Sequence, residues 1–130
     1  MINNFQGHYR FLSNFWIEPD GSHVEGEYQA RKSDPPTLSV ERLLPGQAKR
    51  AGKTLILRKD WDQVKLQIMR ELVTAKFTHH PSLAHLLLSS GDANIIEGNT
   101  WGDQYWGVCQ GTGENHLGKI LMDIRRQLQQ

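Results

Sequence analysis

The stretch that decides the fold reads DWDQVKLQIMRELVTAKFT and runs from Asp60 to Thr78. Its apolar side chains recur at helical spacing, and they are Trp61, Val64, Ile68, Leu72 and Ala75, widened by Met69, Val73 and Phe77. Asp60 is a good N-cap residue, and Gln63 follows three positions later as in a capping box. The pattern predicts a long amphipathic helix over residues 61–78, with Trp61 largely buried at its start.

Helical signals continue on both sides of this stretch. Towards the C-terminus, Pro81 suits the first turn of a helix that Gly91 ends, and a last helix begins near Asn115. The apolar stripe of that last helix comprises Leu117, Ile120, Leu121, Ile124 and Leu128. Towards the N-terminus we expect short helices over residues 37–44 and 47–51, separated by Pro45 and Gly46 and stopped by Gly52. A further helix, capped by Ser22 after the Asp20-Gly21 turn, should end before Asp34-Pro35-Pro36.

Strand signals are few. The side chains of residues 9–12 alternate briefly in polarity, and residues 53–58 hold a short apolar run, so each could form a short strand. Residues 97–114 look like a long loop rich in Gly, Asn and Trp. The sequence therefore predicts a mainly α chain with a few short strands. Its 130 residues suit one domain over residues 1–130.

Composition excludes several classes of protein. A formal net charge of +1 gives no global electrostatic attraction for nucleic acid or membranes, and one cysteine, Cys109, excludes an intrachain disulfide. No apolar run approaches the ~20 residues that cross a bilayer, and the N-terminus lacks a signal-peptide pattern. We expect a cytoplasmic protein with no membrane partner. His79, His80 and His85 match no zinc motif, so neither a metal nor a cofactor is expected.

One candidate catalytic set lies in the segment before Asp34. Glu25, Gln29 and Lys32 are spaced four and three apart, so a helix would project them from one face. The carboxylate can move protons, the amide can hold a substrate and the amine can attack an electrophilic carbon. The alternative is a solvated helix face, and spacing alone does not exclude it.

A second candidate is the segment 97–107, which is dense in residue types found in binding pockets. A flat ligand could stack on Trp101, Tyr105 or Trp106. Alternatively, one Trp fills the core while the acids cap turns. The glycine-containing segment 111–115 that follows is either a simple helix lead-in or a weak anion site.

Taken together, these segments resemble the NADAR family, also called YbiA-like proteins. The resemblance runs through nearly the whole chain, from residues 5–7 and 10–15 through 24–25 and 28–32 to 48–52, 57–61 and 69–77. It ends with residues 96–97, 103–107 and 115–125. The order and spacing of these pieces carry the resemblance.

The resemblance implies a compact, mainly helical fold and cleavage of N-glycosidic bonds. Its implied substrates are ribosylated aminopyrimidine phosphates of riboflavin synthesis and ADP-ribose attached to guanine. It favours the catalytic interpretation of Glu25 and Lys32 over the solvated face. Gln29 on the same stripe is a substrate-binding candidate, and the resemblance implies such a role for Arg10, Asn14, Asp103, Trp106, Gly107 and Asn115.

The leading hypothesis is thus an N-glycosidase that acts on a nucleotide-like small molecule, with ADP-ribosylated nucleic acid as a candidate partner. Lys32 would act as a neutral nucleophile that forms a Schiff base, or as a cation that binds phosphate or hydroxyl groups. The alternative hypothesis is a non-catalytic binding module for nucleotide or ADP-ribose ligands. An interaction protein without a catalytic or ligand-binding site ranks third.

Overall fold

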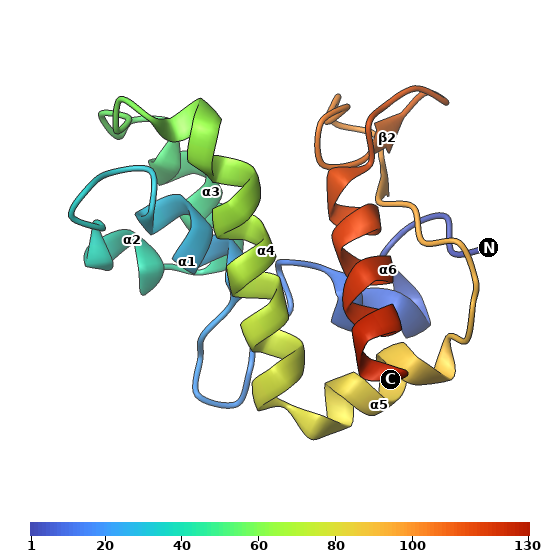
Figure 1. Ribbon diagram of the computed structural model, residues 1–130. Helices are drawn as coiled ribbons and strands as arrows, with labels where there is room; N and C mark the ends of the chain where they lie inside the picture. The colour runs from blue at the N-terminus through green and yellow to red at the C-terminus, as the bar shows by residue number, and fades with distance from the viewer. The chain divides into compact units, whose positions relative to one another are not determined.

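The computed structural model describes residues 1–130, and helices make up most of its regular structure (Figure 1). The elements are η1 (Gly7–Leu12, a 3-10 helix), α1 (Val24–Ala30), α2 (Leu38–Glu41), α3 (Pro45–Gly52), α4 (Trp61–His79), α5 (Pro81–Ser89), β1 (Gly98–Asn99), β2 (Val108–Cys109) and α6 (His116–Leu128). The predicted mainly α fold with a few short strands is confirmed. No helix is long and apolar enough to cross a membrane.

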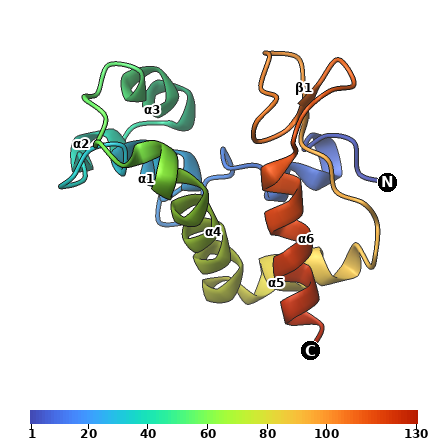
Figure 2. The same ribbon diagram turned by 45° about the horizontal axis from the view of Figure 1, so that its top comes forward.

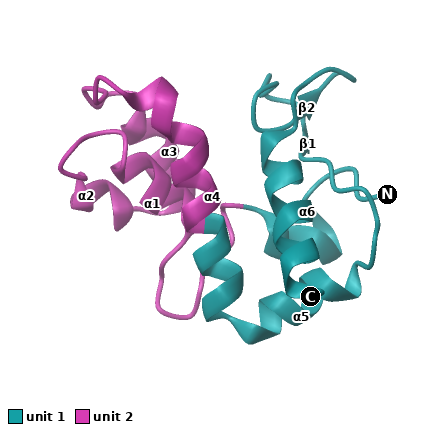
Figure 3. Cartoon of the chain, viewed as in Figure 1, with its two compact units in different colours: residues 1–13, 73–130 teal, residues 14–72 magenta.

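The chain divides into two compact units, which Figure 3 shows in different colours. Unit 1 comprises residues 1–13 and 73–130, and unit 2 comprises residues 14–72. The helix α4 begins in unit 2 and ends in unit 1. One domain over residues 1–130 stays a prediction.

Unit 2 is built around α1, which packs against both α2 and α3 (Figure 1). The buried apolar residues of this unit are Val24, Tyr28, Ala30, Val40, Ala48, Trp61, Ile68, Met69 and Leu72. Trp61 is 6% exposed, and its ring lies 5.1 Å from that of Tyr28 between centroids. The predicted burial of Trp61 is confirmed, and it ties the first turn of α4 to α1.

Unit 1 centres on α5 and α6, which pack against each other (Figure 2). Its core includes Phe11, Leu12, Val73, Phe77, Leu83, Leu87, Ile95, Leu117, Ile120, Leu121 and Ile124. The strands β1 and β2 pair in parallel, with Gly98 opposite Val108 and Asn99 opposite Cys109. Both strands lie in the segment predicted to be loop.

The long helices follow their sequence signals. α4 begins at Trp61, α5 has Pro81 in its first turn and Gly91 beyond its end with a φ of 68°, and α6 follows Asn115. Four of the five residues of the predicted α6 stripe are buried, namely Leu117, Ile120, Leu121 and Ile124. Repeated apolar spacing over several turns predicts these helices because each must bury one face.

Both predicted strands are wrong. Residues 9–12 belong to η1, where the consecutive side chains of Phe11 and Leu12 are both buried, whereas a strand points neighbours to opposite faces. Residues 53 and 54 form a turn, with the backbone N–H groups of Lys53 and Thr54 donating back to Arg50 and Ala51. Residues 56–58 form no regular structure, and Ile56 is 91% exposed. Short apolar runs carry too little periodicity to identify a strand.

Two predicted helix boundaries also need correction. Pro45 does not break a helix but begins α3, because the first turn of a helix tolerates a missing N–H. Ser22 does not cap α1, since its backbone N–H and hydroxyl both donate to Oδ1 of Asp20. The predicted Asp20-Gly21 turn uses Ser22, and the cap falls to the next residue.

Candidate functional site

The cap of α1 is His23, whose ring is fixed on both sides. Nδ1 accepts the backbone N–H of Gly26 at 2.9 Å, and Nε2 lies 2.7 Å from the carbonyl oxygen of Leu43. Since one nitrogen must accept and the other must donate, the neutral tautomer carries its proton on Nε2. The backbone N–H of Glu25 donates to the carbonyl of Asn14 at 3.0 Å. These bonds fix the start of α1, where Glu25 lies.

Glu25 is a buried carboxyl group, 7% exposed, on the second residue of α1. Its Oε1 accepts a hydrogen bond of 2.9 Å from Nε2 of Gln29, one helical turn later. Burial raises the pKa of Glu25, because the apolar surroundings disfavour the charged form. The Gln29 bond and the charges of Lys49 and Lys32 oppose that rise without cancelling it.

Lys32 lies just beyond α1, which ends at Ala30, and its side chain is half-buried. Its backbone N–H donates to the carbonyl of Gln29, so the turn keeps Lys32 close to the helix. Burial lowers the pKa of the Lys32 amine, the charge of Glu25 raises it, and the charges of Lys53 and Lys65 lower it further. The predicted helix face thus holds for Glu25 and Gln29, whereas Lys32 lies outside α1, in the turn that follows it.

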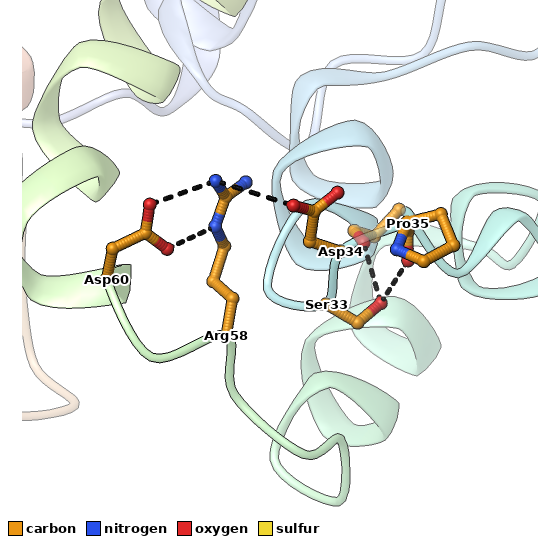
Figure 4. A network of polar contacts seen from close by, with 6 residues as sticks. Ser33, Asp34, Pro35, Arg58 and Asp60 are labelled. Carbon is orange, nitrogen blue, oxygen red and sulfur yellow. Dashed lines mark hydrogen bonds and ion pairs between the residues drawn. The ribbon is translucent and has the colours of Figure 1, made fainter.

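Arg58 fixes the segment that carries Lys32 (Figure 4). Its backbone N–H donates to the carbonyl of Lys32 at 2.7 Å. Its guanidinium donates two hydrogen bonds to Asp60, of 2.6 and 3.1 Å, and lies 3.9 Å from the carboxylate of Asp34. The carboxylate of Asp60, which the sequence predicts as the N-cap of α4, therefore accepts hydrogen bonds from Arg58. The position of Lys32 relative to the start of α4 is set by this contact.

Asn14 also belongs to unit 2. Besides its backbone bond to Glu25, its Nδ2 lies 3.5 Å from the sulfur of Met69 as a hydrogen-bond donor. Unit 2 therefore holds four of the predicted site residues, Asn14, Glu25, Gln29 and Lys32.

The other predicted residues belong to unit 1. Arg10 lies on η1, where its guanidinium is exposed and makes no hydrogen bond or ion pair within the chain. Asp103, Trp106, Gly107 and Asn115 lie in the segment between β1 and α6 or at its end. Each of these four has a structural task, which the next paragraphs describe.

Asp103 caps the turn that carries the aromatic residues. Its Oδ1 accepts the backbone N–H groups of Tyr105 and Trp106 at 3.1 and 2.9 Å. The half-buried indole of Trp106 stands edge-on to Tyr105, with 4.8 Å between centroids and 89° between planes. Gly107 lies so close to Glu97 that a Cβ would collide with its backbone and carboxylate oxygens.

Asn115 precedes α6 but does not cap it with its side chain. It adopts a left-handed conformation with a φ of 57°, its Oδ1 accepts the N–H of Glu97 and its Nδ2 donates to the carbonyl of Ile95. The first N–H groups of α6 donate to the carbonyls of Tyr105 and Trp106. The segment 111–115 is therefore a helix lead-in, and those donors are not available to an anion.

The sequence did not single out His23 or Arg58. Histidine is an uncommon cap, and only the bond from Nε2 to Leu43, twenty residues away, makes His23 suitable. Arg58 acts through a backbone bond to Lys32 that spacing cannot reveal. Lys76 is buried at 7% exposure with Nζ donating to the carbonyl of Ser13, and its sequence pattern indicates only a place on a helix. No group of three or more His, Cys, Asp or Glu side chains is placed to hold a metal ion.

Comparison with known proteins identifies a family and several relatives that this chain resembles. The model of the NADAR domain family matches residues 4–129. The chain is 38% identical over 137 residues to an N-glycosidase of Nostoc punctiforme, which covers 92% of this chain and 86% of that protein. It is 35% identical over 132 residues to a riboflavin biosynthesis protein of Vibrio vulnificus, covering 92% of this chain but 36% of that longer protein.

The fold has a solved counterpart as well. The NMR structure of Escherichia coli YbiA superimposes with a TM-score of 0.80 and 37% sequence identity, over 99% of this chain and 87% of that one. The predicted resemblance and the predicted enzyme class are thus confirmed.

Proposed function

This chain belongs to the NADAR domain family, and from that premise we propose that it hydrolyses the N-glycosidic bond of a ribosylated base or nucleotide, with Glu25 and Lys32 as catalytic residues. The observation that carries the proposal is the pairing of a buried acid with a half-buried amine. Burial raises the pKa of Glu25 and lowers that of Lys32. Both shifts favour the neutral forms, in which the carboxyl group can donate a proton and the amine can attack.

The reaction divides between these two groups. Breaking the bond between C1′ and the base nitrogen leaves the bonding electrons on the base and positive charge on the sugar. The Glu25 carboxyl donates its proton to the leaving base, and the Lys32 amine attacks C1′. Opening of the sugar ring then gives a Schiff base on Lys32. Water hydrolyses it, which releases the sugar, restores the amine and returns a proton to Glu25.

The names of two relatives support a substrate class for this proposal. One is named an N-glycosidase and another a riboflavin biosynthesis protein, which supports a ribosylaminopyrimidine phosphate as substrate. ADP-ribosylated guanine, free or in DNA, is the second substrate that we propose, on the family resemblance. A substrate-binding role for the remaining predicted residues, Arg10, Asn14, Asp103, Trp106, Gly107 and Asn115, is proposed on the family resemblance.

A panel of three substrates tests the function: a ribosylaminopyrimidine phosphate, ADP-ribosylated guanosine and ADP-ribosylated DNA. We expect free base from at least one of them. Binding without release of base from any of the three would instead support a binding module.

The role of Lys32 has its own test. Borohydride added during turnover should reduce the Schiff base and add the mass of the reduced sugar to the peptide that contains Lys32. Lys32→Ala should abolish turnover and trapping, whereas Lys59→Ala, an exposed lysine in the same unit, should change neither. Near-normal activity in Lys32→Ala would exclude a nucleophile at this position. Lost activity without a trapped adduct in the unmodified enzyme would point to an electrostatic role.

A further inference from the structure

The side-chain amide of Gln29 is enclosed on both sides. The residue is 5% exposed, and its Nε2 donates to Oε1 of Glu25 at 2.9 Å. Its own Oε1 is fully buried and has no hydrogen-bond partner. A buried acceptor without a partner costs free energy, so this orientation of the amide must be imposed by its surroundings.

Gly52, the last residue of α3, supplies that constraint. A Cβ at this position would collide with Oε1 of Gln29 and lie 2.6 Å from Cδ. The α-carbon of Gly52 therefore lies directly against the amide, and only glycine leaves room for it. Since α3 packs against α1, the amide is held between the two helices.

These contacts change the role expected of Gln29. An amide that bound substrate would need a free donor or acceptor in reach of the ligand. Here the donor is engaged by Glu25, and the acceptor is closed off by Gly52. The side chain of Gln29 can therefore affect the reaction only through its hydrogen bond to Glu25.

We propose that Gln29, backed by Gly52, is a positioning residue that keeps Oε1 of Glu25 an acceptor, so that the proton transferred by Glu25 is carried on Oε2. This inference rests on the proposed catalytic role of Glu25. A protonated carboxyl group has one accepting carbonyl oxygen and one O–H. Because Nε2 of Gln29 can only donate to Oε1, the O–H is left to the other oxygen. The bond thereby selects the atom that gives up the proton.

Gln29→Met tests the proposal, because methionine keeps the length of the side chain and removes the donor. We expect kcat to fall by up to about tenfold, the upper value of one hydrogen bond between uncharged groups, with KM within about twofold. The limb of the pH profile that belongs to Glu25 should move to higher pH, since the lost bond favoured the charged form. Gln63→Met makes the same change at an exposed position of α4 and should alter none of these values.

Gly52→Ala tests the backing contact. It should move the Glu25 limb in the same direction as Gln29→Met by displacing the amide. In a Gln29→Ala background the added methyl group meets no amide, so Gly52→Ala should then have little further effect. Full additivity of the two changes would contradict a shared action on Glu25.

A ¹³C NMR titration of the Glu25 carboxyl carbon separates this inference from the proposed function. The titration needs no turnover, and it should move to higher pH in Gln29→Met even if every substrate in the panel fails. If the Glu25 titration stays in place while KM rises, Gln29 contacts substrate and the positioning role is overturned. Thermal melts of each variant confirm that the fold is retained, and Gln29→Leu, which also removes the donor at similar size, repeats the test should Gln29→Met unfold.

Discussion

Replacing Glu25 by glutamine should raise stability while it destroys activity. The carboxyl group is buried, and burial is the largest cause of its raised pKa. The amide introduced by Glu25→Gln would retain an oxygen to accept the bond from Gln29 but would carry no charge. Loss of the acid should lower kcat by about 10²- to 10⁴-fold, as general acid–base contributions typically do.

The sign of the stability change follows from proton linkage. Folding raises the pKa of Glu25 above its unfolded value of 4.5, so between these two values the folded state binds more protons than the unfolded state. The wild-type protein therefore loses stability as the pH rises above 4.5 through the folded pKa. Glu25→Gln escapes this loss, and its advantage should be full above the folded pKa and fade as the pH falls towards 4.5.

The gain in stability of Glu25→Gln can be expressed per unit of the pKa shift. Each pH unit by which folding raises the pKa corresponds to about 1.4 kcal/mol of unfolding free energy. A chain of 130 residues unfolds with an entropy of about 0.27 kcal/mol/K. The melting temperature of Glu25→Gln should thus exceed that of the wild type by about 5 °C for each such unit.

Two matched variants sharpen the measurement. Glu27, on the same helix, also has its pKa raised by burial and by Glu41, so Glu27→Gln should gain stability but keep its activity. Glu71→Gln, at an exposed position of α4, should change neither. Thermal melts and single-turnover rates at pH 4.5 and 7 decide the matter. A Glu25→Gln protein that melts below the wild type at pH 7 would refute the reasoning, because the neighbouring lysines would then outweigh burial.

Two further predictions concern the tryptophans. Trp61→Ala should cost about 3–5 kcal/mol of unfolding free energy, because the indole is buried against Tyr28; a loss below about 1 kcal/mol in denaturant melts would show that the contact contributes little. Trp106→Ala should raise the substrate Kd by roughly 5- to 150-fold through loss of a stacking surface, and Trp106→Phe should restore much of it. If Trp106→Ala instead lowers the melting temperature sharply and its folded fraction binds as before, the residue belongs to the core.

The extent to which the sequence predicted the fold depends on the length of each signal. α4 and α6 were predictable because their apolar residues recur over several turns, and Pro81 and Gly91 mark the limits of α5. The expected strands at residues 9–12 and 53–58 rested on four to six residues. Residues 9–12 lie in a 3-10 helix, residues 53 and 54 lie in a turn, and Arg58 donates its N–H to the distant Lys32 rather than to a neighbouring strand.

The sequence predicted which residues of the candidate site lie near one another along the chain, but not the contacts that they make with distant residues. Spacing brought Glu25, Gln29 and Lys32 together because one helix and the turn after it carry all three. The contact of Gln29 with Gly52 joins residues twenty-three positions apart in sequence, and the bond of His23 to Leu43 joins residues twenty apart. Such contacts depend on how helices pack, which residue spacing does not encode.

The contact between Arg58 and Lys32 also bears on how the chain tolerates changes in length. Residues 33–57 form a long loop of chain between Lys32 and Arg58. The 2.7 Å hydrogen bond from the backbone N–H of Arg58 to the carbonyl of Lys32 joins its two ends. Insertions or deletions in the mostly exposed stretch 53–57 then alter a closed loop, whose entropy changes only slowly with its length. The nucleophile proposed here would keep its place while that stretch changes length, because the bond that holds Lys32 lies outside it.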